Sequence, residues 1–484
     1  MHLEDLTIKS FHDGLKNKEF KVLEVVQGFF ERIKKEDGKI HSLLTLLESD
    51  AAARAEDVDA KIASGEEIGA MAGVPMVIKD NILINGFRAT ASSRILENYV
   101  SSYDATVINK LKKNDTIFLG KTNLDEFAMG ASTENSAYGV TRNPHDLERV
   151  AGGSSGGSAA AIAANFALGG LGSDTGGSIR QPAAFCGVVG MKPTYGRTSR
   201  FGVMAMASSL DQIGPFAKTV EDTEIIFNSI QGKDPFDATS VDVEYSPEND
   251  PKKIKELKIG IPKEFFVDGM SAEVKNGIDE SVAKLKSLGF KFKDISLPHT
   301  KYALSTYYIV VPAEVSANMA RFDGIRYDRI KNLGKSGDKE RSALWDIYFK
   351  NRGERFGAEV RRRILLGTFV LSAGYYDAYY AKAQKVRRLI QNDFKEAFKE
   401  VDVILTPVTP TTAFKIGEKA DDPLAMYLSD IFTISLNLAG LPGISIPVKK
   451  YKIGGGELPV NFQLIGKHFR EADIFGVGKV YENN

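Results

Sequence analysis

Glycine and serine cluster twice in this chain, in GGSSGGS at residues 152–158 and in DTGGS at residues 174–178. Apolar, helix-compatible segments follow both clusters, which is not typical of a low-complexity linker. The second cluster predicts a strand, a tight glycine turn and then a short helix. Such a turn directs consecutive backbone N–H groups into one concavity, where they can stabilise a developing oxyanion. We expect those N–H groups to belong to four consecutive residues: Thr175, Gly176, Gly177 and Ser178.

The residues around these glycines argue against three other interpretations of the two clusters. A phosphate-binding loop needs a lysine followed by Ser or Thr after its last glycine, and neither cluster has one. The single DTG at residues 174–176 lacks the second copy that an aspartic protease needs. GGSSG also fits a nucleophile elbow, with His299 or His468 as the base. An elbow follows a strand, and residues 145–151 (HDLERVA) are not predicted to form one.

A serine nucleophile needs a base, and none of the six histidines lies within either cluster. Lys79 ends the apolar run VPMVIK, where strand alternation places Val77 and Lys79 on one face and Asp80 on the other. A partly desolvated lysine has a lowered pKa and can accept a proton near neutral pH. Alone, Lys79 would be an ordinary lysine at a strand end. The two serine clusters make it the candidate base.

The elements that position these residues alternate between strands and helices, which indicates an α/β fold with a largely parallel or mixed sheet. Helices are predicted over residues 18–36, closed by Gly38, and over residues 51–64, closed by Gly65, with a strand between them at residues 42–47.

Further along the chain, a helix over residues 273–288 lies between strands at residues 257–262 and 290–298, which is a βαβ pattern. Residues 244–256 are charged and contain two prolines, so they form the best linker candidate. Residues 340–400 are mostly helical.

Composition narrows the class of protein. With 484 residues, 43% hydrophobic and 26% charged, the chain is globular rather than disordered or fibrous. Its 63 basic and 63 acidic residues cancel, so no overall field attracts nucleic acid or an anionic membrane. The single cysteine, Cys186, lies in an apolar segment and is expected in the core, and no His and carboxylate group has zinc spacing. Lacking a signal peptide or a spanning segment, the chain is expected in the cytoplasm.

Three segments occur here in the order that defines the amidase signature enzymes: IKD at residues 78–80, GGSSGGS, and DTGGSIRQP at residues 174–182. The chain resembles that family. The resemblance implies the amidase signature fold, a large central mixed β-sheet covered by helices on both faces. It also implies a single domain over residues 1–484, with a signature core at about 70–220 and a helical segment at about 300–400.

The resemblance implies a Ser-Ser-Lys triad. Ser178 is expected to be the acyl-forming nucleophile, Ser154 the bridging serine and Lys79 the general base. Ser155 supports the relay. In this family the peptide bond that precedes the bridging serine, here between Gly153 and Ser154, is cis.

Within the family, the similarity extends over almost the whole chain and is greatest to the A subunits of glutamyl-tRNA(Gln) amidotransferases. The matching segments include FAMGAST, SSLDQIGPFAKTVED, FDGIRY, RRRILLGTF, SAGYYDAYY and LNLAGLPGISIPV. This similarity implies a glutaminase that supplies ammonia to convert Glu-tRNA(Gln) to Gln-tRNA(Gln) in translation. The alternatives are a free-standing amidase that hydrolyses another small amide and a non-enzymatic binding subunit.

The similarity also implies partners. The chain is expected to form a heterotrimer with B and C subunits, in which the B subunit holds most of the tRNA and uses ATP and Mg. No cofactor is expected in this chain. The tyrosine-rich residues 372–380 either contribute apolar surface to the partner interface or pack internally.

Free glutamine carries an α-carboxylate and an α-ammonium group, so a specific site needs one fixed cation and one fixed anion. By resemblance, Arg363 in RRRILLG binds the carboxylate and Asp430 in YLSDIF binds the ammonium group. Tyr308 in TYYIVV adds a hydroxyl contact. Arg361 and Arg362 are adjacent alternatives to Arg363.

Overall fold

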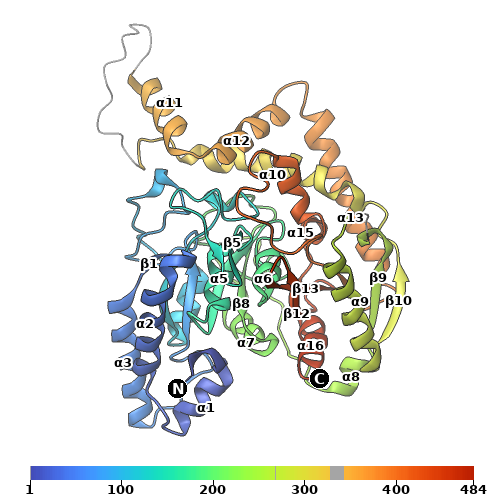
Figure 1. Cartoon of the computed structure of the whole chain (residues 1–484). Coiled ribbons are helices and arrows are strands. Elements are labelled where there is room, and N and C mark those ends of the chain that lie inside the picture. The colour runs from blue at the N-terminus through green and yellow to red at the C-terminus, as the bar shows by residue number, and fades with distance from the viewer. Residues whose placement is uncertain (1, 267–268, 328–342) are drawn as a thin grey trace.

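A mixed sheet of 11 strands forms the centre of the molecule, in the order β1-β3-β2-β6-β8-β7-β12-β13-β11-β9-β10 (Figure 1). The computed structural model describes residues 2–266, 269–327 and 343–484. The strands are β1 (Leu43–Leu46), β2 (Pro75–Lys79), β3 (Ile117–Thr122), β6 (Gly169–Asp174), β7 (Val189–Lys192), β8 (Gln212–Ala217), β9 (Lys258–Pro262), β10 (Lys291–Ile295), β11 (Val403–Pro407), β12 (Gly443–Ile453) and β13 (Gly456–Gly466). Strand β2 runs parallel to β3 and β6, whereas β8 runs antiparallel to β6 and β7. The predicted mixed sheet is confirmed.

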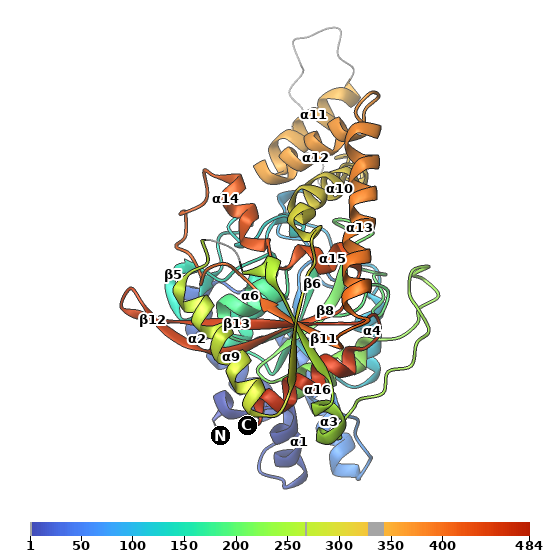
Figure 2. The same ribbon diagram turned by 90° about the vertical axis from the view of Figure 1, so that its right-hand side faces the viewer.

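Helices cover both faces of this sheet (Figure 2). At β12 and β13, α6 (Arg180–Cys186) packs on one face, and α9 (Ala272–Ser287) and α16 (Glu471–Glu482) pack on the other. The other helices outside the segment between β10 and β11 are α1 (Ile8–Lys16), α2 (Val22–Ile40), α3 (Glu48–Ser64), α4 (Thr106–Lys113), α5 (Gly156–Ala163), α7 (Val220–Ile230), α8 (Pro251–Lys255), α14 (Pro423–Tyr427) and α15 (Ile434–Ala439). None of the described helices is long and apolar enough to cross a membrane.

Most predicted elements are present. Helix α3 ends as expected at Gly65, which adopts a left-handed φ of 80°. The βαβ pattern is confirmed, because β9 and β10 pair in parallel on either side of α9. The linker candidate is wrong in part, since residues 251–255 form α8, although residues 244–250 have no regular structure.

The predicted end of the first long helix at Gly38 is wrong. Helix α2 continues through Gly38 to Ile40, whose side chain is buried, and His41 ends it with a left-handed φ of 60°. The Asp37 carboxylate accepts hydrogen bonds from the backbone N–H groups of Ser42 and Leu43, which fixes the turn just past the helix. A buried side chain and this carboxylate cap therefore outweigh the low helix propensity of glycine.

The prediction that residues 145–151 do not form a strand is also wrong, because residues 146–150 form one. Strand β5 (Asp146–Val150) pairs with β4 (Arg142–Asn143) outside the main sheet. Its other edge meets a distant segment, where Val150 N–H donates to the Phe414 carbonyl. Long-range pairing produces this strand, and the alternation of its side chains alone does not indicate it.

The helical segment between β10 and β11 projects from the sheet at the top of Figure 1. It contains α10 (Ala303–Asn318), α11 (Ala343–Arg355), α12 (Ala358–Leu371), the π-helical turn η7 (Asp377–Ala381) and α13 (Lys382–Ala397), and residues 328–342 lie outside the described part. Val311, Val360 and Ile390 from these helices share one hydrophobic cluster with Ile404 and Ile465 of the sheet. This shared core packs the helical segment onto the sheet, and the single domain over residues 1–484 stays a prediction.

Candidate active site

Lys79 lies at the carboxyl end of β2, an inner strand between β3 and β6, and its side chain is fully buried. Its Nζ lies 2.8 Å from both Ser154 Oγ and Ser155 Oγ. Because β6 runs parallel to β2, its carboxyl end reaches the same edge, and Ser173 Oγ lies 3.0 Å from Lys79 Nζ. Three hydroxyl groups thus surround one buried amine.

Burial lowers the pKa of Lys79 to about 7. The carboxylates of Asp125, Asp174 and Asp211 favour the charged form and oppose this effect, but desolvation is the larger contribution. Asp80, the next residue, does not pair with Lys79 and instead lies 3.0 Å from Lys121 Nζ. Near neutral pH, Lys79 can therefore accept a proton.

The loop that carries Ser154 is held from two sides. The peptide bond between Gly153 and Ser154 is cis, as the resemblance implies. Gly153 N–H donates to Gln181 Oε1 at 3.0 Å, and the Gln181 amide donates in turn to the Ala131 carbonyl at 2.8 Å. On the other side, Asp125 N–H donates to the Ser154 carbonyl at 3.2 Å. Neither contact is predicted from the sequence, although Gln181 lies within the DTGGSIRQP motif.

Ser178 follows the predicted strand–turn–helix arrangement, between β6 and α6, and is 9% exposed. Its carbonyl accepts a hydrogen bond from Ser155 N–H at 3.1 Å, so the two serine clusters are in direct contact. Asp174 anchors the turn, since its carboxylate accepts from Ile179 N–H and forms a fully buried ion pair with Arg180 at 3.0 Å. The structure therefore brings the two serine clusters and Lys79 together.

The four-residue oxyanion prediction needs one correction. Gly177 N–H donates to Asp174 Oδ1 at 2.9 Å and is therefore committed to that carboxylate. Thr175, Gly176 and Ser178 remain as candidate donors of backbone N–H groups. Gly177 keeps a different role, because its φ of 130° is one that a residue with a side chain rarely adopts.

Arg363 lies on α12 and is 3% exposed. Its Nε lies 2.7 Å from Glu359 Oε1, and its guanidinium carbon lies 5.4 Å and 5.7 Å from the ring centroids of Tyr308 and Tyr427. Burial is the largest single effect and lowers the pKa of Arg363, but the Glu359 carboxylate and the tyrosines around the guanidinium together outweigh it, so the pKa is raised. These four residues line a cavity of about 170 Å³, and Arg362 also lines it. The cavity therefore holds a permanent cation.

Asp430, the candidate for the complementary charge, is not among the residues that line this cavity. Its Oδ1 is buried and has no hydrogen-bond partner among the described residues, although the residue as a whole is partly exposed. Burial and the like charge of Asp174 raise the pKa of Asp430 well above its usual range. An unpaired carboxylate of this kind is stabilised in its charged form when an ammonium group binds. Thr433 ties this segment to the oxyanion turn, because its hydroxyl lies 2.6 Å from the Gly176 carbonyl.

The alternatives to Arg363 differ from it in burial. Arg361 is exposed and donates to the Gly353 carbonyl, and it does not line the cavity. Arg362 lines the cavity and pairs with Glu359, but its side chain is 43% exposed. Tyr308 stacks on Tyr427, with ring centroids 3.8 Å apart, so its ring contacts are clear, whereas its hydroxyl contact with substrate stays a prediction.

The competing candidates find other partners. His299 Nδ1 lies 2.7 Å from Asp393 Oδ1, and His468 Nε2 lies 3.1 Å from the Ala439 carbonyl, so Lys79 and neither histidine contacts Ser154. Cys186 is fully buried, and burial raises the pKa of its thiol. The described residues contain no group of three or more His, Cys, Asp or Glu side chains that could hold a metal ion.

Comparison with known proteins agrees with this geometry. The profile of the Amidase family matches residues 24–475. The A subunit of glutamyl-tRNA(Gln) amidotransferase from Carboxydothermus hydrogenoformans is 56% identical over 486 residues, covering 100% of this chain and 98% of the relative. The protein of the same name from Persephonella marina is 56% identical over 479 residues, covering 99% and 96%. The crystal structure of the corresponding protein from Thermotoga maritima, 43% identical, covers 100% of this chain and 96% of the other with a TM-score of 0.81. This chain therefore belongs to the Amidase family, the amidase signature enzymes.

Proposed function

We propose that this chain is the A subunit of a glutamyl-tRNA(Gln) amidotransferase. It hydrolyses glutamine and supplies the ammonia that converts Glu-tRNA(Gln) to Gln-tRNA(Gln). The observation that carries the proposal is the 56% identity, over the whole chain, with proteins of that name. The contacts of Lys79 with Ser154 and Ser155 give such a protein its hydrolytic centre.

The proposed reaction starts with a proton transfer. Neutral Lys79 accepts the hydroxyl proton of Ser154, which accepts the proton of Ser178 as the Ser178 oxygen attacks the amide carbon of glutamine. The N–H groups of Thr175, Gly176 and Ser178 stabilise the oxyanion of the tetrahedral intermediate. The relay then returns the proton to the leaving nitrogen, and ammonia departs from a γ-glutamyl ester on Ser178.

Water completes the cycle. The same relay takes a proton from water, the resulting hydroxide attacks the ester carbonyl, and glutamate leaves as the proton returns to Ser178. Ser155 also contacts Lys79 Nζ at 2.8 Å and holds the amine between the two hydroxyls. Within the protein, each proton in the proposed route therefore moves between the serine hydroxyl groups and one amine.

Specificity for glutamine follows from the two charges on either side of the substrate backbone. Arg363 binds the α-carboxylate through the guanidinium nitrogens that Glu359 leaves unused, and Asp430 binds the α-ammonium group. Tyr308 contributes through its hydroxyl. The contact of Thr433 with the Gly176 carbonyl supports this arrangement, because it joins the segment that follows Asp430 to the oxyanion turn.

The proposal includes partner subunits. Ammonia in bulk water at pH 7 is largely protonated and loses its nucleophilicity, so the site must deliver it to a docked synthetic subunit. We assign that synthetic role, with ATP and Mg, to a B subunit that holds most of the tRNA in a cytoplasmic heterotrimer with a C subunit. Tyr375, Tyr376 and Tyr379 are 43%, 46% and 41% exposed, which supports an interface at residues 372–380 over internal packing.

Ammonia release tests the proposal against a free-standing amidase. We expect the chain with its partner subunits to release ammonia from glutamine and the Ser178→Ala variant to release none. Fast cleavage of an alkyl or aryl amide without any turnover of glutamine would favour the free-standing amidase. No turnover of any amide would favour a binding subunit.

A further inference from the structure

A buried contact fixes the first residue of the oxyanion turn from outside the three motifs. The Thr175 hydroxyl donates to Asp211 Oδ1 at 2.6 Å. Thr175 is 2% exposed and Asp211 is 4% exposed. The register of the sheet brings them together, because Asp174 at the end of β6 lies opposite Gln212 at the start of β8. The two residues that flank this strand pair therefore meet.

Asp211 is itself held in place by its own loop. Its Oδ2 accepts hydrogen bonds from the backbone N–H groups of Met206 and Ala207 at 2.9 Å and 3.1 Å. These bonds close residues 206–211 around the carboxylate, and Oδ1 accepts from the Thr175 hydroxyl at 2.6 Å and from the shared Ala207 N–H at 3.2 Å. Backbone N–H groups thus fix the orientation of the Asp211 carboxylate. The carboxylate can in turn fix the position of the Thr175 hydroxyl that donates to it.

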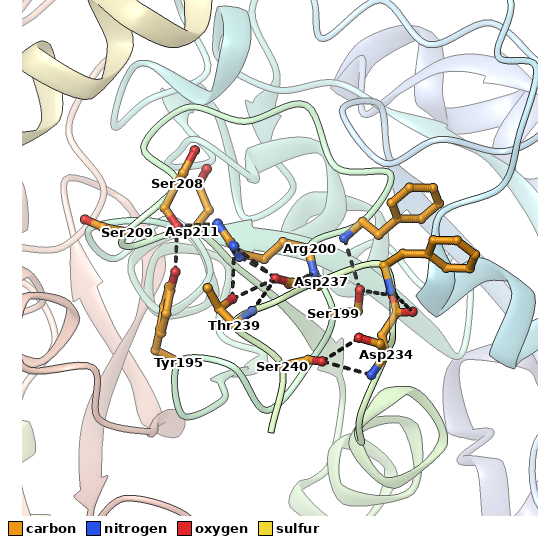
Figure 3. Close-up of polar contacts among 12 residues, drawn as sticks. Tyr195, Ser199, Arg200, Ser208, Ser209, Asp211, Asp234, Asp237, Thr239 and Ser240 are labelled. Atoms are coloured by element: carbon orange, nitrogen blue, oxygen red, sulfur yellow. Dashed lines mark hydrogen bonds and ion pairs between the residues drawn. The ribbon is translucent and has the colours of Figure 1, made fainter. Parts of the chain in front are cut away.

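Side chains outside this loop secure it further (Figure 3). The Tyr195 hydroxyl donates to the Ser208 carbonyl at 2.8 Å, and an Arg200 Nη group donates to the same carbonyl. Arg200 also forms an ion pair with Asp237 at 3.0 Å. The loop around Asp211 is thus anchored to a second, more distant loop.

The oxyanion turn is consequently held at three places. Asp174 accepts from Gly177 N–H within the turn, and Thr433 contacts the Gly176 carbonyl from the substrate-binding segment. Asp211 holds the remaining position, Thr175. We propose that Asp211 is a positioning residue that, through the Thr175 hydroxyl, fixes the backbone N–H groups that stabilise the oxyanion. This inference rests on the proposed acyl transfer at Ser178, and it does not depend on glutamine being the substrate.

Thr175→Val is the cleanest variant, because valine matches threonine in shape and lacks only the hydroxyl. Thr106→Val is its matched control, since the Thr106 hydroxyl donates to another largely buried carboxylate, Asp234, at 2.5 Å in the same region. Asp211→Asn is less informative, because the Asp211 carboxylate also favours the charged form of Lys79.

We expect Thr175→Val to lower kcat about 10-fold to 100-fold with KM within about 2-fold, because removing an oxyanion donor outright lowers kcat by about 10² to 10³. Thr175→Ser should keep kcat within about 3-fold, since it retains the hydroxyl. Thr106→Val should leave kcat unchanged. The proposal is overturned if Thr175→Val keeps the wild-type kcat, or if Thr106→Val loses as much.

A second measurement tests the proposal without using glutamine as the substrate. An alkyl fluorophosphonate reacts with an activated serine by forming an O–P bond and releasing fluoride, and its P–O group then occupies the oxyanion site. Mass spectrometry gives the rate constant of labelling at Ser178. We expect a decrease of about 10-fold or more in Thr175→Val and none in Thr106→Val. Equal rates in both variants would overturn the proposal even if glutamine were not the substrate.

Discussion

Burial lowers the pKa of Lys79, and the proposed role of this residue as the general base can be tested through that shift. With a pKa of about 7, roughly half of the Lys79 side chains are neutral at pH 7. A lysine with the ordinary value would be neutral in only about one molecule in 3,000 at the same pH. The environment created by β2, β6 and the serine loop therefore increases the population of the active base about 10³-fold.

The sign of the pH dependence follows directly. Because the neutral amine is the base, log kcat/KM for glutamine should rise with pH below about 7 and level off above it. Lys79→Arg keeps a cation next to Ser154, but a guanidinium does not lose its proton in this range. We expect kcat/KM of this variant to be about 10²-fold to 10⁴-fold lower than that of the wild type. We also expect its kcat/KM not to rise with pH in this range.

The assay is the initial rate of ammonia release between pH 5.5 and 9, with protein folding checked at each pH by circular dichroism. Either of two results would refute this reasoning. One is a wild-type profile that keeps rising up to pH 9, which would mean that Lys79 keeps its ordinary pKa. The other is a Lys79→Arg variant that retains the wild-type rate and profile.

Three further predictions concern the nucleophile, the substrate charges and the cysteine. A trapped acyl adduct should map to Ser178 by mass spectrometry, and an adduct on Ser154, Ser155 or Cys186 would reject the assignment. The Ser154→Ala variant should fold but turn over slowly. In steady-state kinetics, Arg363→Lys should raise KM for glutamine about 10-fold or more because it loses the guanidinium fork, and Asp430→Asn should do so because it loses the negative charge. Arg361→Lys should change KM less than about 3-fold. Because burial raises the pKa of the Cys186 thiol, iodoacetamide should not label the native protein, and Cys186→Ala should keep the wild-type kcat.

The sequence was sufficient to single out the candidate groups, because each lies in a short segment with few alternative explanations, whereas their roles in the triad come from the resemblance and stay a prediction. Lys79 ends an apolar strand, and Ser178 follows a glycine turn, so the strand and turn chemistry could be inferred before any distance was known. The direction of the Gly177 N–H group could not be inferred in this way. Whether Gly177 faces the concavity depends on where the Asp174 side chain lies, and residue order does not determine that.

The supporting contacts were harder to predict because their partners are distant in sequence. Thr433 lies more than 250 residues from Gly176, and no local pattern distinguishes it from other threonines. Strand β5 was missed for a similar reason, since Phe414 from a remote segment pairs with Val150. Positions that depend on long-range packing are therefore those where sequence reasoning fails.

The transfer of the amide nitrogen tests the central claim most directly. The chain would be assembled with its partner subunits, ATP, Mg and Glu-tRNA(Gln), and supplied with glutamine labelled with ¹⁵N at the side-chain amide. We predict that the label appears in Gln-tRNA(Gln), and that the complex containing Ser178→Ala forms labelled product from ammonium but not from glutamine. Unlabelled product in the wild-type complex, or labelled product from glutamine in the Ser178→Ala complex, would contradict the account.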